Sequence, residues 1–499
     1  MENRPSTAKR LTYALPVTAI YLILNIFLLT RHEPGSAEAL VYLTNFGSEN
    51  MAGSGFPVLT ALLLMPLKGI GLPFSMAGLI SLVFMTGAAL IVLLCSPFHP
   101  VLSILMVLSP VFGYFLGIQL TPFAPAVFLI VALAALFPVR RRWWLLYWVL
   151  VALLFQTHIT LWGFAAALTG TDIVINWMVR RQNPDTKTPG GVLKVFLPFL
   201  LPLASCGYSI YLLTGSSLSF KVRSFGSLMR SILRVALTLV GQASGMDIVI
   251  QWVLILCLVF ALGHVFFTVR MPWQTFILAL GIALQGIASY MVGSIPVQSG
   301  MVTFFMTVWF VWIILGYTHD ESMVHVYNAA SSGNVELEIF VGLLFLLPAI
   351  GYFSVIRSDV PLLYSDARNT AAQVRLIAGD DLVVTADSRY AMSLAAQDPD
   401  LVIADMVHGT DLGDLLYGKM QPDGKITADA EAPATYSELT EAMALRGLAA
   451  PGDTWYLLTT ENSVLSDMDI WSTVMENVYT TESETVGQES FRLYKVQMS

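Results

Sequence analysis

Long apolar runs separated by short polar segments fill the first 356 residues of the chain. Many of them are as long, or nearly as long, as the roughly 20 residues that an α-helix needs to cross a bilayer. These runs are residues 11–30, 74–95, 101–117, 121–138, 143–157, 159–178, 192–214, 248–268, 274–292, 300–317 and 337–356, and a half-length apolar stretch covers 56–70. The pattern predicts a polytopic α-helical membrane protein with about eleven transmembrane helices.

Short apolar segments alternate with amphipathic ones in the remainder of the chain. Strands are expected at 381–387, 400–405, 455–459 and 491–496, and helices at 366–378, 389–396 and 436–447. Strands that alternate with helices indicate a parallel or mixed sheet. We therefore expect two domains, a transmembrane domain over residues 1–356 and an α/β domain over residues 357–499.

Composition and charge separate the same two parts. Apolar residues make up 56% of the chain and charged residues 12%, against a usual charged share of about 25%, so a large soluble enzyme is excluded. Residues 1–356 carry 17 Lys+Arg and 11 Asp+Glu, a formal charge of +6, whereas residues 357–499 carry 9 and 23, a charge of −14. An acidic tail repels anionic polymers, and nucleic acid is not an expected partner.

Loop charges predict the orientation, because Lys and Arg concentrate on the cytoplasmic side of a membrane. With the N-terminus inside, the basic segments 140–142 and 180–194 and Arg270 all fall in the cytoplasm. The 31–73 loop, the 215–247 loop and the acidic tail are then extracytoplasmic. The expected location is a plasma membrane, the inner membrane of a bacterium, with membrane lipids around the helices.

The 215–247 loop is expected outside the cytoplasm but is basic, against the rule that Lys and Arg concentrate on the cytoplasmic side. Arg223, Arg230 and Arg234 fall on one face of a helix whose other face is apolar, which is typical of an amphipathic helix at the membrane surface. Two interpretations stay open. The arginines contact lipid head groups, or they hold the phosphate of a lipid-linked substrate.

Candidate chemistry gathers directly after the first apolar run, at Arg31, His32, Glu33 and Glu38. A carboxylate at a membrane–water boundary can act as a general base on an acceptor hydroxyl, or it can bind a divalent cation. Partial desolvation would raise the pKa of such a carboxyl towards a useful value.

Three further polar residues are candidates for ligand binding, but each also has a purely structural explanation. His158 is expected at the outer end of a span, where a hydrogen-bonded boundary histidine is a more common role than a ligand. Asp387 and Asp405 end expected strands, and an acidic residue there caps the following helix more often than it binds a ligand.

The three cysteines all lie in apolar runs, so neither a disulfide framework nor a cysteine metal site is expected.

Several short motifs follow one another in the first part of the chain. They are Arg31-His32-Glu33-Pro34, Glu38-Ala39, Tyr42-Leu43, Gly55-Phe56-Pro57-Val58-Leu59, Gly71-Leu72-Pro73 and Ser96-Pro97-Phe98. By these motifs, residues 10–180 resemble a bacterial group of the GT-C type polytopic membrane glycosyltransferases. The whole chain is similar to that group in architecture, with a basic N-terminus, one span, an acidic first loop, about ten further spans and an extracytoplasmic α/β tail. That group is expected to have Arg-Asp-Glu in the first loop and Gly-His-Pro-Pro in the second segment, where this chain has Ala37 in place of Asp and Phe56 in place of His.

The resemblance implies transfer of a sugar from a polyprenyl-phosphate donor to an extracytoplasmic acceptor. Glu38 matches the family carboxylate, and Glu33 is a helper. Arg31, His32 and His158 are our own candidates for substrate binding. Beyond what the family motifs imply, we expect the Arg223/Arg230/Arg234 face to hold the donor phosphate. The alternative is a non-catalytic relative that anchors a cell-envelope partner through its tail, and the two departures favour it. The sugar, the acceptor and a divalent cation stay open.

Overall fold

The computed structural model describes most of the helices and the tail sheet. The described residues are 7–43, 57–70, 73–109, 111–182, 196–214, 226, 228–229, 272–292, 297–318, 365–398, 400–406, 435–445, 448, 454–460, 463, 465, 475–481 and 490–497. The chain divides into two compact units. Unit 1 is Met1–Leu28, Gly55–Leu62 and Gly78–Ile356, and unit 2 is Leu29–Ser54, Leu63–Ala77 and Arg357–Ser499. Unit 2 therefore joins the tail with two segments that the apolar pattern assigned to the transmembrane domain.

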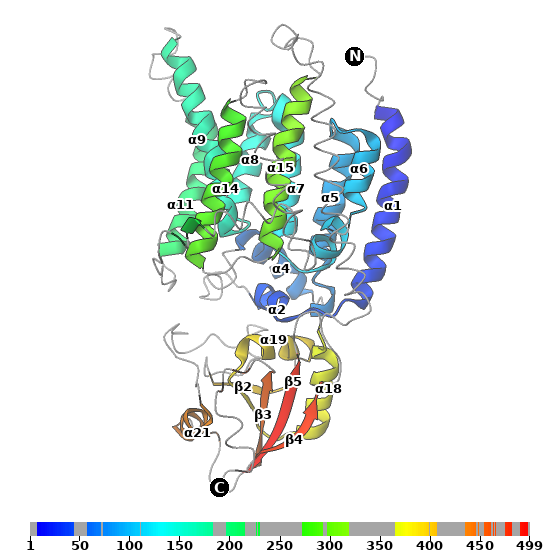
Figure 1. Cartoon of the computed structure of the whole chain (residues 1–499), viewed down its shortest axis with the longest axis vertical. Coiled ribbons are helices and arrows are strands. Elements are labelled where there is room, and N and C mark those ends of the chain that lie inside the picture. The colour runs from blue at the N-terminus through cyan, green and yellow to red at the C-terminus, as the bar shows by residue number, and fades with distance from the viewer. Residues whose placement is uncertain are drawn as a thin grey trace. The chain divides into compact units, whose positions relative to one another are not determined.

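Helices make up the described part of unit 1 (Figure 1). In chain order they are α1 (Thr7–Arg31), α4 (Val58–Gly69), α5 (Leu79–Cys95), α6 (Pro100–Val107), η2 (Val111–Ile118), α7 (Phe123–Leu136), η3 (Phe137–Val139), α8 (Trp144–Phe155), α9 (Ile159–Gln182), η5 (Leu197–Phe199), α11 (Leu200–Thr214), α14 (Pro272–Val292) and α15 (Val297–Thr318). The boundary between the units falls within α1 and within α4.

Four stretches among the described residues are long and apolar enough to cross a membrane. They are Arg10–Arg31, Phe74–Cys95, Ile159–Met178 and Leu197–Thr214, which coincide with four of the expected spans. Shorter apolar helices occupy Phe123–Val139, Trp144–Phe155, Trp273–Ala288 and Val302–Leu315, and the expected spans 248–268 and 337–356 lie outside the described residues. The chain has the character of a membrane protein.

The expected span at 101–117 is wrong as a single helix. Helix α6 ends at Val107, and a separate π-helix, η2, runs over Val111–Ile118. The sequence supplies the reason at Pro110, because a proline has no N–H for the helix ladder and disfavours α geometry at the residue before it.

Close backbone approach joins α9 and α14, which lie side by side in Figure 1. A Cβ atom added at Gly163 would lie 2.2 Å from the Cβ atom of Leu284, and one added at Gly281 would lie 2.9 Å from Cδ2 of Phe164. These two glycines therefore let the helices pack at a distance that any larger residue would prevent. Small residues have this use in membrane helix pairs.

Polar side chains of α1 bind backbone carbonyls of neighbouring helices. The Arg10 guanidinium donates to the carbonyl oxygens of Leu94 and Ser96 at 3.2 and 2.6 Å, at the C-terminus of α5. The Tyr21 hydroxyl donates to the Phe112 carbonyl of η2 at 2.9 Å. A cation at a helix C-terminus is favourable for the helix dipole and satisfies carbonyls that the helix leaves without partners.

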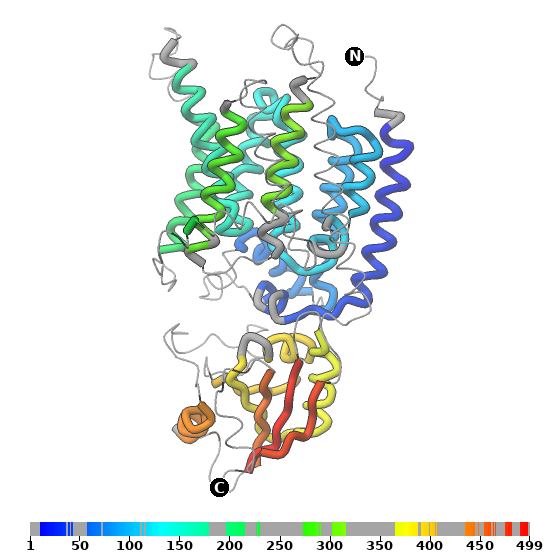
Figure 2. The backbone as a smooth tube through the Cα atoms, in the orientation of Figure 1, coloured from blue at the N-terminus to red at the C-terminus, as the bar shows by residue number. Residues whose placement is uncertain are grey.

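Unit 2 contains a five-stranded mixed sheet of order β2-β1-β3-β5-β4. The strands are β1 (Val383–Thr385), β2 (Ile403–Asp405), β3 (Thr454–Thr460), β4 (Met475–Thr480) and β5 (Phe491–Gln497). Strand β1 pairs in parallel with β2 and β3, and β5 pairs antiparallel with β3 and β4. In the tube view of Figure 2 the strands β3, β5 and β4 run beside one another. The helices of the tail are α18 (Ala367–Ala378), α19 (Ser388–Gln397) and α21 (Tyr436–Leu445).

The mixed sheet and the three tail helices confirm the sequence prediction for this region. Strand β4 was not predicted, because Met-Glu-Asn-Val-Tyr-Thr shows no clean apolar alternation. It is an edge strand whose register with β5 shifts between Asn477 and Tyr479. Backbone pairing with β5, rather than burial of its own side chains, therefore defines this strand.

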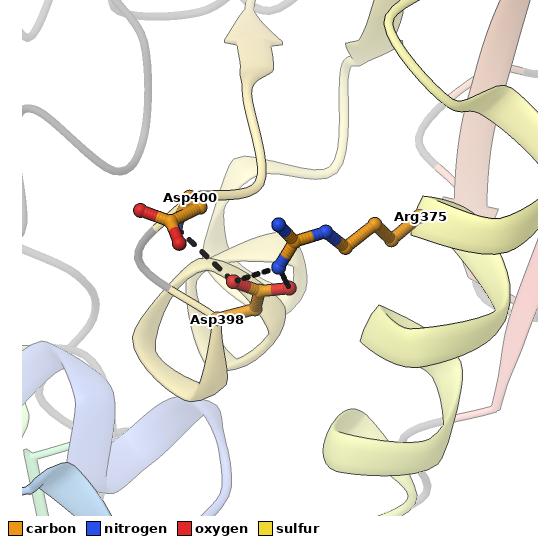
Figure 3. Close-up of polar contacts among 3 residues, drawn as sticks. All are labelled: Arg375, Asp398 and Asp400. Carbon is orange, nitrogen blue, oxygen red and sulfur yellow. Dashed lines mark hydrogen bonds and ion pairs between the residues drawn. The ribbon is translucent and has the colours of Figure 1, made fainter.

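An ion pair on the tail surface links α18 to the end of α19 (Figure 3). The Arg375 guanidinium lies 3.1 Å from Oδ2 of Asp398, and Oδ1 of Asp398 accepts the backbone N–H of Asp400 at 3.1 Å. The Arg375 side chain is 57% exposed. Exposed pairs of this kind contribute about 0–1 kcal/mol, so the pair orients the turn more than it stabilises the domain.

Replacing Gly163 by Ala is expected to lower the free energy of unfolding by about 1–3 kcal/mol, because the new methyl group overlaps Leu284. Gly170 lies in the same helix, and an added Cβ there meets nothing within 4 Å. Gly170→Ala should therefore stabilise α9 by about 0.5–1 kcal/mol. Thermal unfolding of both variants in detergent measures the difference. Equal effects of the two substitutions would contradict the close approach of α9 and α14.

Candidate functional site

A four-residue turn connects α1 to the short helix α2 (Ser36–Leu43) and carries the candidate acids. Pro34 cannot continue a helix, and α1 ends at Arg31. The Gly35 carbonyl then accepts the backbone N–H groups of Glu38 and Ala39 at 3.1 and 3.0 Å, which starts α2. Helix α2 extends to Leu43, and the residues that follow it lie outside the described part of the chain.

His32 and Glu38 form a buried pair across this turn. Nε2 of His32 lies 2.7 Å from Oε1 of Glu38, and each side chain is 4% exposed. The sequence spacing of His32 and Glu38 does not indicate that their side chains meet. The start of α2 after Gly35 brings the two side chains together. A histidine held by a carboxylate has a defined ring orientation, which is useful for proton transfer.

Glu33 is half-buried beside this pair and has a different environment. Its Oε2 atom has no hydrogen-bond partner among the described residues. Burial raises the pKa of the Glu33 carboxyl, and the nearby Asp366 carboxylate adds to the increase, whereas Arg368 and His32 oppose it. Asp366 and Arg368 belong to the start of α18, so the electrostatic environment of the first loop includes the tail. Arg31, the fourth expected residue of this loop, is exposed.

Helix α2 packs against α19 of the tail within unit 2. At the C-terminus of α2, the Lys68 ammonium donates a hydrogen bond to the Tyr42 carbonyl and lies 4.4 Å from the centroid of the Tyr42 ring. The Tyr42 ring packs edge-on against Phe74, with 5.1 Å between centroids. Burial lowers the pKa of Lys68 to about 8. Lys68 was not among the predicted site residues, although it is the one charged residue in the apolar stretch 56–70.

Asp387 joins two strand ends of the tail sheet. Its Oδ2 atom accepts the backbone N–H of Thr460 at 3.0 Å, so it links the end of β1 to the end of β3. Asp387 stands at the N-cap position of α19, but its side chain makes no capping hydrogen bond, so the expected capping role is wrong for this side chain. The strand order reverses between β1 and β3, the place where α/β sheets bind ligands. The side chain of Asp405 lies outside the described residues.

The other expected binding residues are not part of this cluster. His158 lies in unit 1 and is buried, where its Nδ1 atom accepts the backbone N–H of Thr160 at 3.3 Å and lies 2.9 Å from the Thr160 hydroxyl. A nitrogen that accepts an N–H carries no proton, so the ring is neutral. Its contacts fit a boundary histidine at the start of α9. Arg223, Arg230 and Arg234 lie outside the described residues.

The site thus combines a carboxylate–histidine pair, a second acid and a lysine in one unit. Among the described residues, no group of three His, Cys, Asp or Glu side chains is placed to hold a metal ion. The groups that are present can accept a proton from a hydroxyl and bind an anion.

Glu33→Gln is expected to become more stable than the native chain as the pH rises. The folded state holds the Glu33 proton more tightly than the unfolded state, whose pKa is close to the ordinary value of 4.5. The stability that protonated Glu33 contributes is therefore complete below pH 4.5 and is lost as the pH rises through the folded pKa. Glutamine does not ionise. Melting temperatures between about pH 4 and 8 measure the gap, and the exposed Glu476→Gln is the control. A gap that does not change with pH would contradict this environment.

Comparison with models of known protein families gives no match, and comparison with curated protein sequences gives no relative. The resemblance to GT-C glycosyltransferases therefore stands on the motifs quoted above.

Proposed function

We propose that this chain is a membrane glycosyltransferase that takes a sugar from a polyprenyl-phosphate donor. The observation that carries the proposal is the buried Glu38–His32 pair, one turn beyond the end of an apolar helix long enough to cross a membrane. In the proposed arrangement about eleven spans surround the donor, and the first loop and the tail are extracytoplasmic. The GT-C resemblance supports the choice of Glu38 as the catalytic carboxylate.

In the proposed reaction Glu38 takes the proton of an acceptor hydroxyl. The hydroxyl oxygen attacks the anomeric carbon of the sugar, and the bond between that carbon and the phosphate oxygen breaks. The products are the glycosylated acceptor, with inverted configuration, and the polyprenyl phosphate. His32 orients the Glu38 carboxylate through their 2.7 Å contact. General base catalysis of this kind contributes about 10²–10⁴-fold to a rate.

In this proposal the tail domain binds the acceptor. Helix α19 packs against α2, and α18 begins at residues whose charges act on Glu33. A domain in contact with the base-bearing helix can position an acceptor next to that base. We assign acceptor binding to this domain for that reason.

One observation favours the second candidate, a non-catalytic anchor for a cell-envelope partner. The Glu38 side chain is 4% exposed and His32 lies against its carboxylate, so a substrate hydroxyl reaches Glu38 only after a local rearrangement. The replacement of the family Asp and His by Ala37 and Phe56 points the same way. Both candidates keep the contact between α2 and α19, and they differ in whether Glu38 exchanges a proton.

Glu38→Gln is expected to reduce sugar transfer by about 10²–10⁴-fold, because an amide accepts no proton from the acceptor. Glutamine keeps the shape of the side chain and can still hydrogen-bond to His32. The assay follows loss of a radiolabelled polyprenyl-phosphate sugar in proteoliposomes supplied with membranes as the acceptor source.

Glu476→Gln is the matched control, because Glu476 is an exposed glutamate on β4 in the same unit. It should transfer sugar at the native rate. Native activity in Glu38→Gln would reject Glu38 as the base. Absence of transfer in the folded native protein, together with recovery of a bound partner through the tail, would favour the anchor.

A further inference from the structure

The turn Arg140-Arg141-Arg142 connects two apolar helices of unit 1 and lies short of the end of the neighbouring helix α9. Nε of Arg140 lies 3.8 Å from Oδ2 of Asp172 on α9, which places the turn at the level of Asp172. The apolar stretch of α9 continues to Met178, six residues and about 9 Å further along the helix axis. In Figure 1, α9 likewise extends beyond α7 and α8 at this end. The arginines therefore lie below the membrane face that the apolar part of α9 reaches.

Contacts within the protein hold the Arg140 side chain. Its Nη1 atom donates to the Phe137 carbonyl at 3.2 Å, and its Cζ atom lies 3.9 Å from the centroid of the Phe137 ring. With the Asp172 carboxylate beside it, the side chain is 26% exposed. Arg140 therefore joins the turn to α9, and its charge is offset within the protein.

The other two arginines of the turn, Arg141 and Arg142, are exposed. The Asp172 carboxylate also attracts Arg141, but less than it attracts Arg140. Among the residues that the structure describes, no second carboxylate forms an ion pair with either exposed arginine. The three arginines and Asp172 together have a formal charge of +2. A cation near the hydrocarbon core needs a counter-charge, because water solvates it poorly there.

The residues after the arginines follow the chemical order of a phospholipid. Trp143 and Trp144 are 54% and 40% exposed, and Leu145 and Leu146 are 60% and 44% exposed. Tryptophan is enriched at the head-group level of membranes, and leucine suits the acyl chains. Four residues of helix rise from Arg142 to Leu146, about 6 Å, and the head-group region on each side of a bilayer is about 5–8 Å thick. The start of α8 therefore presents cations, indoles and aliphatic side chains over the depth of one head group.

We infer that Arg141 and Arg142 bind the phosphate of an anionic phospholipid. Local thinning of the bilayer brings the head group to the turn, as it does for other charged groups below a membrane face. Guanidinium groups bind phosphate oxygens in bidentate geometry. The net charge of the turn selects an anionic lipid over a zwitterionic one, whose head group carries its own cation. This site lies in unit 1 and includes none of the first-loop residues, so it does not depend on the proposed transfer reaction.

The test measures which lipid the purified full chain retains in a neutral detergent. Phosphatidylglycerol and phosphatidylcholine are supplied at equal concentration, and native mass spectrometry gives the ratio of the two in the complex with one bound lipid. A basic side chain near a membrane surface favours an anionic lipid by about fivefold. Arg141→Gln/Arg142→Gln should therefore lower the ratio by about 25-fold. Arg141→Lys/Arg142→Lys keeps both charges and should keep the preference for phosphatidylglycerol.

Asp172→Asn separates lipid binding from a purely structural role of the arginines. It raises the formal charge of the cluster from +2 to +3 and releases Arg140 from its carboxylate. The preference for phosphatidylglycerol should then rise by about fivefold. Arginines that serve only to neutralise Asp172 would give no such rise, so an unchanged or lower ratio in folded Asp172→Asn would contradict the inference.

Two further arms test the site and the nature of its ligand. Lys495→Gln removes an exposed cation of the tail sheet and should give the native ratio. Glycerol 3-phosphate carries the phosphate without acyl chains and should not displace phosphatidylglycerol at equal concentration. Displacement would replace the lipid by a soluble phosphate as the ligand. An unchanged ratio in Arg141→Gln/Arg142→Gln, with thermal unfolding showing a folded protein, would overturn the site, whatever the sugar-transfer assay gives.

Discussion

The packing of α2 against α19 is the contact on which the first-loop site depends. Helix α2 has 8 residues, and a helix shorter than about 12 residues is marginal by itself in water. It needs a partner that covers its apolar face. Helix α19, attached directly after β1 of the tail sheet, is that partner. The burial of Glu38 and His32 therefore depends on a segment more than 300 residues away along the chain.

Several polar groups of the helix bundle also depend on partners from other helices, in their case through hydrogen bonds. Carbonyls at the end of α5 accept the Arg10 guanidinium, and a carbonyl of the π-helix η2 accepts the Tyr21 hydroxyl. Directly after α8, the Gln156 amide N–H donates to the Ser205 and Ser209 hydroxyls of α11 at 2.6 and 3.2 Å. Where water is excluded, a polar group without a hydrogen-bond partner lowers the free energy of unfolding by several kcal/mol, roughly the loss of a hydrogen bond in an apolar medium. The Tyr21 bond satisfies one backbone carbonyl of the irregular segment η2 among apolar helices.

Two charged groups near the first loop respond to burial in opposite directions. Desolvation raises the pKa of Glu33 and lowers the pKa of Lys68, because burial penalises the ionised form of each. Both changes bring the group closer to the pH at which an enzyme works. An acid and a base tuned in this way around a carboxylate–histidine pair are typical of sites that move protons or bind anions.

Local sequence pattern determined a large part of this structure. Long apolar runs identified the helices α1, α5, α9 and α11, and the alternation of short segments identified the mixed sheet and helices of the tail. Glu38 could be selected because an acid directly after an apolar run is rare in this chain. These features depend on residues close together in sequence, where helix and strand periodicity can be counted.

Only the tertiary structure decided which residues meet. It pairs His32 with Glu38, directs Asp387 to Thr460 instead of to its own helix, and brings Lys68 to Tyr42. It also adds the edge strand β4 through backbone pairing and joins the first loop to the tail in one unit. Such contacts depend on packing between segments distant in sequence, and no local periodicity encodes which partner a buried polar group finds.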